Sequence, residues 1–97
     1  MGSEVRLSRR ARSDLEDIFL YTAREWSPAQ ARVYVSVLHE AMTLIATKTH
    51  RAQSLDHVRE GYRAYRVRSH LLIYRENADV TEIVRILHAR MDVPRHL

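Results

Sequence analysis

The sequence predicts an α+β domain in which a helical hairpin packs on one face of a mainly antiparallel sheet. Three observations lead to this fold class. Residues 61–92 contain three short strand-like runs joined by tight turns, residues 13–48 contain two stretches with helical spacing of apolar residues, and residues 4–9 alternate between apolar and polar. The expected order is strand, helix, helix, strand, strand, strand. A chain of 97 residues can bury one modest core, so we expect residues 1–97 to form a single domain.

The first strand is expected over Glu4 to Arg9, because Val5 and Leu7 fall on one side and polar residues on the other. A half-buried strand of this kind needs a neighbour. We therefore expect it to pair with the sheet formed by the C-terminal half of the chain.

Two helices follow with almost no loop between them. Ser13-Asp14-Leu15-Glu16 matches a capping box and predicts that the first helix starts at Ser13. Ser27-Pro28 gives a second start signal, and helical spacing continues to about Lys48. Each helix carries an apolar stripe, formed in the first by Leu15, Ile18, Phe19, Thr22 and Trp26 and in the second by Ala31, Tyr34, Val35, Leu38, Met42 and Ile45.

The C-terminal half predicts a three-stranded meander. Residues 49–60 have no periodicity and are expected to form an exposed connection before it. Leu71 to Tyr74 form an apolar run typical of a buried central strand, and simple alternation puts Ile83 and Ile86 of the last strand on opposite faces. One face of the sheet is expected to be core and the other a basic, aromatic-edged surface. Residues 93–97 are expected to form a short flexible tail, because Val93-Pro94 favours extended backbone.

Composition excludes several classes of site. The chain has no Cys, and its six His residues lack paired metal-ligand spacing, so neither a metal nor a cofactor is expected. No segment is apolar enough to span a membrane or act as a signal peptide, and a cytoplasmic location is expected. The net charge is +4, and only one of the 16 basic residues is Lys. Arg suits contacts with carboxylates, phosphates and aromatic groups, so both an acidic protein and a nucleic acid remain possible partners.

No strong catalytic signature is present. The best set of polar groups comprises Arg66, Arg68, Tyr74, Arg85, His88 and Arg90, which the predicted meander could gather on its open face. Such a set could serve a metal-independent ribonuclease, with Arg stabilising phosphate charge while His or Tyr moves a proton. A solvated basic face and a protein-binding face are alternative interpretations of the same residues.

Three segments resemble one protein family. Leu7-Ser8 with Ala11 and residues 14–18 is similar to its opening, residues 62–75 to its central hairpin, and Ile86-Leu87-His88-Ala89-Arg90-Met91-Asp92 to its ILH-x-RMD ending. The chain resembles a ParE-type toxin of the RelE/ParE superfamily, from bacterial type II toxin-antitoxin systems. This resemblance implies the RelE/ParE-like fold, whose element order is the one predicted above.

The resemblance also implies partners and an activity. A ParE-like toxin is expected to inhibit DNA gyrase by protein-protein binding, without being an enzyme. Its neutralising partner would be a ParD-like antitoxin, with a DNA-binding N-terminal part and an acidic or amphipathic C-terminal tail, in a toxin-antitoxin hetero-oligomer. RelE-type relatives instead cut messenger RNA on the ribosome. That alternative would use Arg66, Arg85, His88 and Arg90, but it is weakened because places that are basic in those ribonucleases hold Ala64 and Leu71 here.

Two sets of binding residues follow from these expectations. The gyrase-binding set lies on the last strand and the tail and comprises His88, Arg90, Met91, Asp92, Pro94 and Arg95. The antitoxin-binding set lies on the helical hairpin and comprises Trp26, Tyr34, Leu38 and Met42. A third possibility is a harmless relative that only sequesters an antitoxin.

Overall fold

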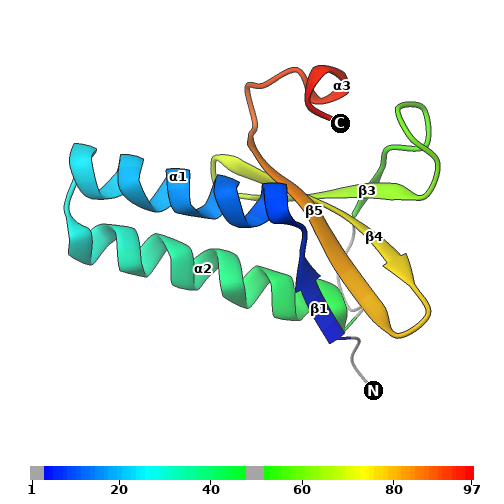
Figure 1. The fold of residues 1–97 in the computed structure, drawn as a ribbon, viewed down its shortest axis with the longest axis horizontal. Coiled ribbons are helices and arrows are strands. Elements are labelled where there is room, and N and C mark those ends of the chain that lie inside the picture. Colours follow the sequence, from blue (N-terminus) through cyan, green and yellow to red (C-terminus); the bar gives the residue numbers. More distant parts are fainter. Residues whose placement is uncertain (1–3, 48–51) are drawn as a thin grey trace.

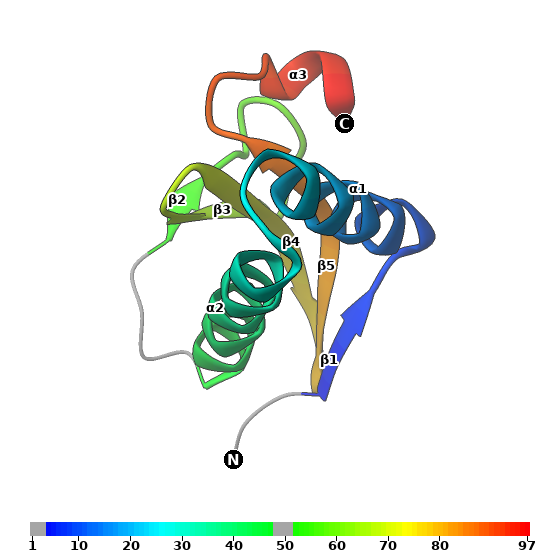
Figure 2. The same cartoon turned by 90° about the vertical axis from the view of Figure 1, so that its left-hand side faces the viewer.

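The predicted fold class is confirmed by the computed structural model, which describes residues 4–47 and 52–97. Two antiparallel helices lie against one face of a five-stranded sheet (Figure 1), and Figure 2 shows the hairpin from the end where the helices join. The sheet order is β1-β5-β4-β3-β2. The elements are β1 (Glu4–Leu7), α1 (Arg9–Glu25), α2 (Pro28–Ala46), β2 (Gln53–Ser54), β3 (Tyr62–Val67), β4 (His70–Asn77), β5 (Val80–His88) and α3 (Val93–His96).

Strand β5 is the organising element of the sheet. It pairs antiparallel with β4 on one side and parallel with β1 on the other, with Glu4 opposite Val80 and Leu7 opposite Ile83. The expected pairing of the first strand with the C-terminal sheet is therefore confirmed. None of the described helices is long and apolar enough to cross a membrane.

The main core lies between the hairpin and the sheet. From α2 it receives Leu38, Met42 and Ile45, and from the sheet Leu72, Tyr74 and Ile83, each at most 2% exposed. Burial of so much apolar surface on both sides of the interface supplies the main driving force for this packing.

A β-bulge in β5 changes which residues reach this core. Ile73 lies opposite Arg85 and Tyr74 lies opposite Ile83, so Val84 is the extra residue. As a result Ile83 and Ile86 both belong to the main core, whereas simple alternation predicted opposite faces. The prediction was wrong because the extra residue at the bulge reverses, from that point on, which side chains of β5 face the hairpin. The side chains of β4 keep their alternation.

The far face of the sheet is not an open basic surface, and that prediction was wrong. It carries a second apolar cluster of Leu55, Tyr62, Ala64, Ile73 and Leu87. The connection before β3 was expected to be fully exposed, but β2 pairs with β3 and Leu55 is buried. Residues 49–51 of that expected connection lie outside the described residues.

Helix α1 begins earlier than the capping box predicted. Ser8 is its N-cap, and the Ser8 hydroxyl accepts a hydrogen bond from the Ala11 N–H at 3.0 Å. Ser13 therefore lies inside the helix. The start of α2 is confirmed, since the Ser27 hydroxyl accepts from the Gln30 N–H at 3.0 Å and Pro28 occupies the first helical position.

The segment after β5 is folded, which corrects the expected flexible tail. Residues Val93–His96 form the short helix α3, in which Pro94 lies in the first turn where its missing N–H costs nothing. Val93 and Leu97 pack against the second cluster. The Arg85 Nη1 donates to the His96 carbonyl at 2.9 Å and ties α3 to the sheet.

Candidate functional site

An apolar, aromatic groove of 530 Å³ lies between the hairpin and the end of β5. We call it the aromatic groove. Three of its side chains are unusually exposed for their size, with Trp26 at 75%, Tyr21 at 59% and Met91 at 45%. The full lining is Asp17, Ile18, Tyr21, Thr22, Trp26, Tyr34, Ser69, His70, His88 and Met91. Exposed apolar groups gathered around a concave surface are typical of a protein-binding site.

The rings of Tyr34, His70 and His88 line this groove and contact one another in that order. The Tyr34 hydroxyl lies 2.6 Å from His70 Nδ1, and the His70 and His88 rings meet edge to face with centroids 5.3 Å apart. Burial raises the pKa of Tyr34, so its hydroxyl remains a donor at neutral pH. Burial, followed by the charge of His88, lowers the pKa of His70 and leaves its Nδ1 free to accept. The network thus links α2 to the start of β4 and the end of β5.

The stretch after β5 forms a second surface beside the groove. Arg90, Met91, Asp92, Pro94 and Arg95 are all exposed. The Arg90 N–H donates to His88 Nδ1 at 3.1 Å, and Arg95 pairs with Asp92 at 3.3 Å. Because His88 and Met91 also line the aromatic groove, the two surfaces are continuous.

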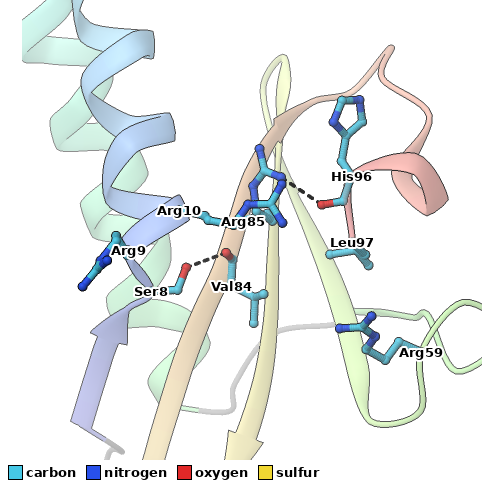
Figure 3. Close-up of a pocket in the computed structure, with 8 residues that line it drawn as sticks. All are labelled: Ser8, Arg9, Arg10, Arg59, Val84, Arg85, His96 and Leu97. Atoms are coloured by element: carbon cyan, nitrogen blue, oxygen red, sulfur yellow. Dashed lines mark hydrogen bonds between the residues drawn. The ribbon is translucent and has the colours of Figure 1, made fainter.

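Arg85 has a structural role in this fold. Its Nε and Nη2 donate to the two carboxylate oxygens of Asp14 at 2.8 and 2.9 Å. The side chains of Arg85 and Asp14 are only 11% and 15% exposed, and the hydrogen bond to Asp14 raises the pKa of Arg85. The third nitrogen, Nη1, holds the His96 carbonyl (Figure 3). Arg85 therefore joins α1, β5 and α3.

The residues expected to serve a ribonuclease do not converge. Strand pairing puts Arg66 and Arg85 on the far face of the sheet and His88 on the hairpin face. Tyr74 is fully buried, and the Arg66 Nε donates to the Arg68 carbonyl at 2.8 Å. The possible gathering of these groups on one open face does not occur in the structure. Among the residues with described positions, no group of three His, Asp or Glu side chains is arranged to hold a metal ion.

A comparison with protein families decides the class of this chain. Residues 5–93 match the family described as the ParE toxin of the type II toxin-antitoxin system parDE. The chain belongs to the ParE toxin family. It is accordingly the toxin component of a type II toxin-antitoxin system.

Individual ParE toxins extend this match over the whole chain. Toxin ParE1 of Caulobacter vibrioides is 39% identical over 92 residues, covering 95% of both chains. Toxin ParE1 of Mycobacterium tuberculosis is 38% identical and covers 100% of both chains. A solved structure described as a chromosomal ParDE system from P. aeruginosa has the same fold, with a TM-score of 0.76 at 18% identity. The match covers 89% of this chain and 95% of that one.

In this ParE toxin the predicted antitoxin-binding residues divide into two groups. Trp26 and Tyr34 line the aromatic groove, as a contact role requires. Leu38 and Met42 are 0% and 2% exposed within the main core, so their side chains are not available to a partner. Including them was wrong, because helical spacing identifies a face of α2 but not how deeply each position is buried.

Two groove residues of the toxin were missed from the sequence. Tyr21 lies on α1 beside the predicted stripe, and at 59% exposure its side chain is accessible in the groove rather than buried in the core. Its position three residues after Ile18, on a neighbouring part of the same helix face, was the available signal. His70 is the first residue of β4, and only the fold brings it to Tyr34 and His88.

Proposed function

We propose that this ParE toxin inhibits DNA gyrase by protein-protein binding through the surface that follows β5. The main support is the exposed stretch of Arg90, Met91, Asp92, Pro94 and Arg95, which is held in place by a folded α3. Arg and Met are enriched in protein interfaces, and a preordered surface loses less entropy on binding. His88 belongs to the same surface through its hydrogen bond from the Arg90 N–H.

The proposed mechanism is inhibition without catalysis. Support comes from the positions of the candidate catalytic groups, since Arg85 is neutralised by Asp14 and Arg66 lies on the opposite face of the sheet from His88. A ribonuclease needs its cationic and proton-transferring groups within reach of one phosphate. Ribonuclease activity is therefore the alternative, and messenger RNA cleavage should be measured alongside gyrase inhibition.

A gyrase supercoiling assay tests the proposed surface. Deleting residues 93–97 would remove Val93 and Leu97 from the second cluster and perturb the fold, so substitutions are preferable. We expect Met91→Ala with Arg95→Ala to raise the half-inhibitory concentration roughly tenfold or more, the effect of losing one or two central contacts. The matched control is Leu44→Ala with Arg32→Ala, which removes an exposed apolar residue and an exposed Arg from α2.

Two results would contradict the gyrase proposal. One is inhibition by the surface variant equal to that of the parent toxin. The other is a parent toxin that leaves supercoiling unaffected but cleaves messenger RNA in a translation extract, which would favour the ribonuclease alternative.

We further propose that an antitoxin neutralises the toxin by docking an amphipathic segment in the aromatic groove. The exposed side chains of Trp26 and Tyr21 would supply apolar contact area, and the net charge of +4 favours an acidic partner. The complex would be a toxin-antitoxin hetero-oligomer, as expected for a chain of this family.

Trp26 makes this second proposal directly measurable. It is the only Trp in the chain, so its fluorescence should shift to the blue when a partner covers it. Titration with the antitoxin encoded beside the toxin should show this shift, and Trp26→Ala should weaken binding by about 2 kcal/mol or more in calorimetry. Leu44→Ala, which removes an exposed side chain outside the groove, should bind as the parent does. An antitoxin that binds tightly without changing Trp26 emission would place the docking site elsewhere.

A further inference from the structure

A second hollow, separate from the aromatic groove, lies at the start of α1. It encloses 280 Å³ between α1, the edge of β5 and α3 (Figure 3). Figure 3 shows Arg9 on the α1 side and Arg59 on the opposite side of β5. We call this hollow the arginine pocket. Its lining is Ser8, Arg9, Arg10, Arg59, Val84, Arg85, His96 and Leu97.

Three of the four guanidinium groups of the arginine pocket are not neutralised. Arg85 is paired with Asp14, but within residues 4–47 and 52–97 no ion pair is found for Arg9, Arg10 or Arg59. The Arg59 guanidinium instead lies 5.5 Å from the centre of the Tyr62 ring, which restrains it by a cation-π contact. Arg9, Arg10 and Arg59 thus give the lining of the pocket positive charge that no ion pair among the described residues balances, and this charge favours binding of an anion.

Helix α1 makes this arrangement less favourable still. Its first turn contains Arg9 and Arg10 and no acidic residue. The N-terminal end of a helix carries partial positive charge, so arginines are among the least favourable side chains there. Sequence positions that break a local rule in this way are expected where a ligand compensates for the cost.

The lining of the pocket favours a ligand in which a negatively charged group is attached to an apolar chain. Val84 and Leu97 provide apolar surface inside it. The backbone of β5 is not available for strand pairing at this point, because the Ser8 hydroxyl donates to the Val84 carbonyl at 2.6 Å and the Ile86 N–H donates to Asp14 at 2.9 Å. A peptide ligand would therefore bind here through a side chain rather than by strand addition.

The surroundings favour a single carboxylate over a long polyanion. Asp56 and Glu60 lie close to Arg59 in the chain, and Glu16 and Asp17 follow further along α1. A nucleic-acid strand that continued past the pocket would meet these negative charges, whereas one side chain would not. We propose that the arginine pocket binds a glutamate or aspartate side chain of a protein partner. This contact requires neither gyrase nor the aromatic groove.

The proposal can be tested by NMR, which detects weak binding. The probe is a blocked pentapeptide, Ser-Leu-Glu-Leu-Ser, titrated into the ¹⁵N-labelled toxin while the Arg Nε–H signals are followed. We expect signals of Arg10 and Arg59 to shift with this peptide and not with its Gln counterpart. Arg10→Gln with Arg59→Gln should weaken binding roughly fivefold or more, since charge-assisted hydrogen bonds are lost. Arg32→Gln, an exposed change on α2, is the matched control.

Three results would overturn the assignment. The first is equal binding of the Glu and Gln peptides, and the second is unchanged affinity in the double variant. The third is a short DNA duplex that produces the same Arg shifts at lower concentration than the peptide, which would indicate a nucleic-acid phosphate as the ligand. Arg10 and Arg59 are exposed, so the double variant should keep the amide spectrum of the folded toxin. This test uses only the isolated toxin and a peptide, so its result does not depend on whether the toxin inhibits gyrase.

Discussion

Replacing Asp14 with Ala should be among the most destabilising changes of a charged residue in this protein. The Asp14 carboxylate accepts three hydrogen bonds, two from Arg85 and one from the Ile86 N–H, at 2.8 to 2.9 Å. The substitution would leave a nearly buried guanidinium without its anion. It would also leave the Ile86 N–H of β5 without its partner, beyond the part of β5 that pairs with β1.

The expected cost follows from burial. Removing one partner of a fully buried ion pair costs about 3–5 kcal/mol. Here the Arg85 and Asp14 side chains keep 11% and 15% exposure, so water can partly compensate. We therefore expect Asp14→Ala to lower the free energy of unfolding by about 2–4 kcal/mol, a large share of the roughly 5–15 kcal/mol typical of a domain. The melting temperature should fall by about 4–8 °C for each kcal/mol lost.

Urea unfolding followed by far-UV circular dichroism measures this effect. Asp17→Ala is the matched control, because it makes the same chemical change on an exposed position of the same helix and should change stability by less than about 0.5 kcal/mol. A double-mutant cycle with Arg85→Met should give a coupling energy of about 1–3 kcal/mol. If Asp14→Ala is no more destabilising than Asp17→Ala, the Asp14–Arg85 contact does not stabilise the fold as argued.

Two further predictions concern the start of α1 and the aromatic groove. Ser8→Ala should cost about 1–2 kcal/mol in urea unfolding, because the cap of α1 and the hydrogen bond to Val84 are both lost, while Ser13→Ala should be nearly neutral. A larger loss of stability in Ser13→Ala than in Ser8→Ala would instead indicate that the capping box at Ser13 stabilises the start of α1. Stability should also fall as the pH drops below 6.5, the ordinary pKa of His70, because the folded-state pKa is lower and the unfolded chain takes up the proton first. His70→Gln should flatten this part of the pH profile, and an unchanged slope would contradict the role given to burial.

The regular elements were predictable because their periods are local properties of the chain. Helical spacing of apolar residues identified both helices, and the short turns around Ser69 and Ala78 identified the meander. The start of α1 was not predictable in the same way, since Ser8 and Ser13 both offer cap chemistry. Ser8 is used because it also bonds Val84, a residue 76 positions away.

The far face of the sheet depends on contacts that no local pattern reveals. The sequence shows Arg85 on a strand, but not that Asp14, 71 positions earlier, neutralises it. It shows Val93-Pro94 as a break, but not that Val93 packs on the second cluster. In the aromatic groove, Trp26 and Tyr34 were predictable from the apolar stripes of the two helices. The hydrogen bond between Tyr34 and His70 was not, because it requires the hairpin to meet the start of β4.

The position of β5 between β1 and β4 has a consequence for synthesis of the toxin on the ribosome. Strand β5, which pairs with both β1 and β4, is the last strand to be made. Its parallel pairing with β1 joins residues from opposite ends of the chain. Contacts of such high sequence separation form slowly. A nascent chain that lacks residues 80–88 has an incomplete sheet and lacks Ile83 and Ile86 of the main core and Leu87 of the second cluster. Interrupted translation should therefore release an unfolded fragment for proteolysis rather than a partly active toxin.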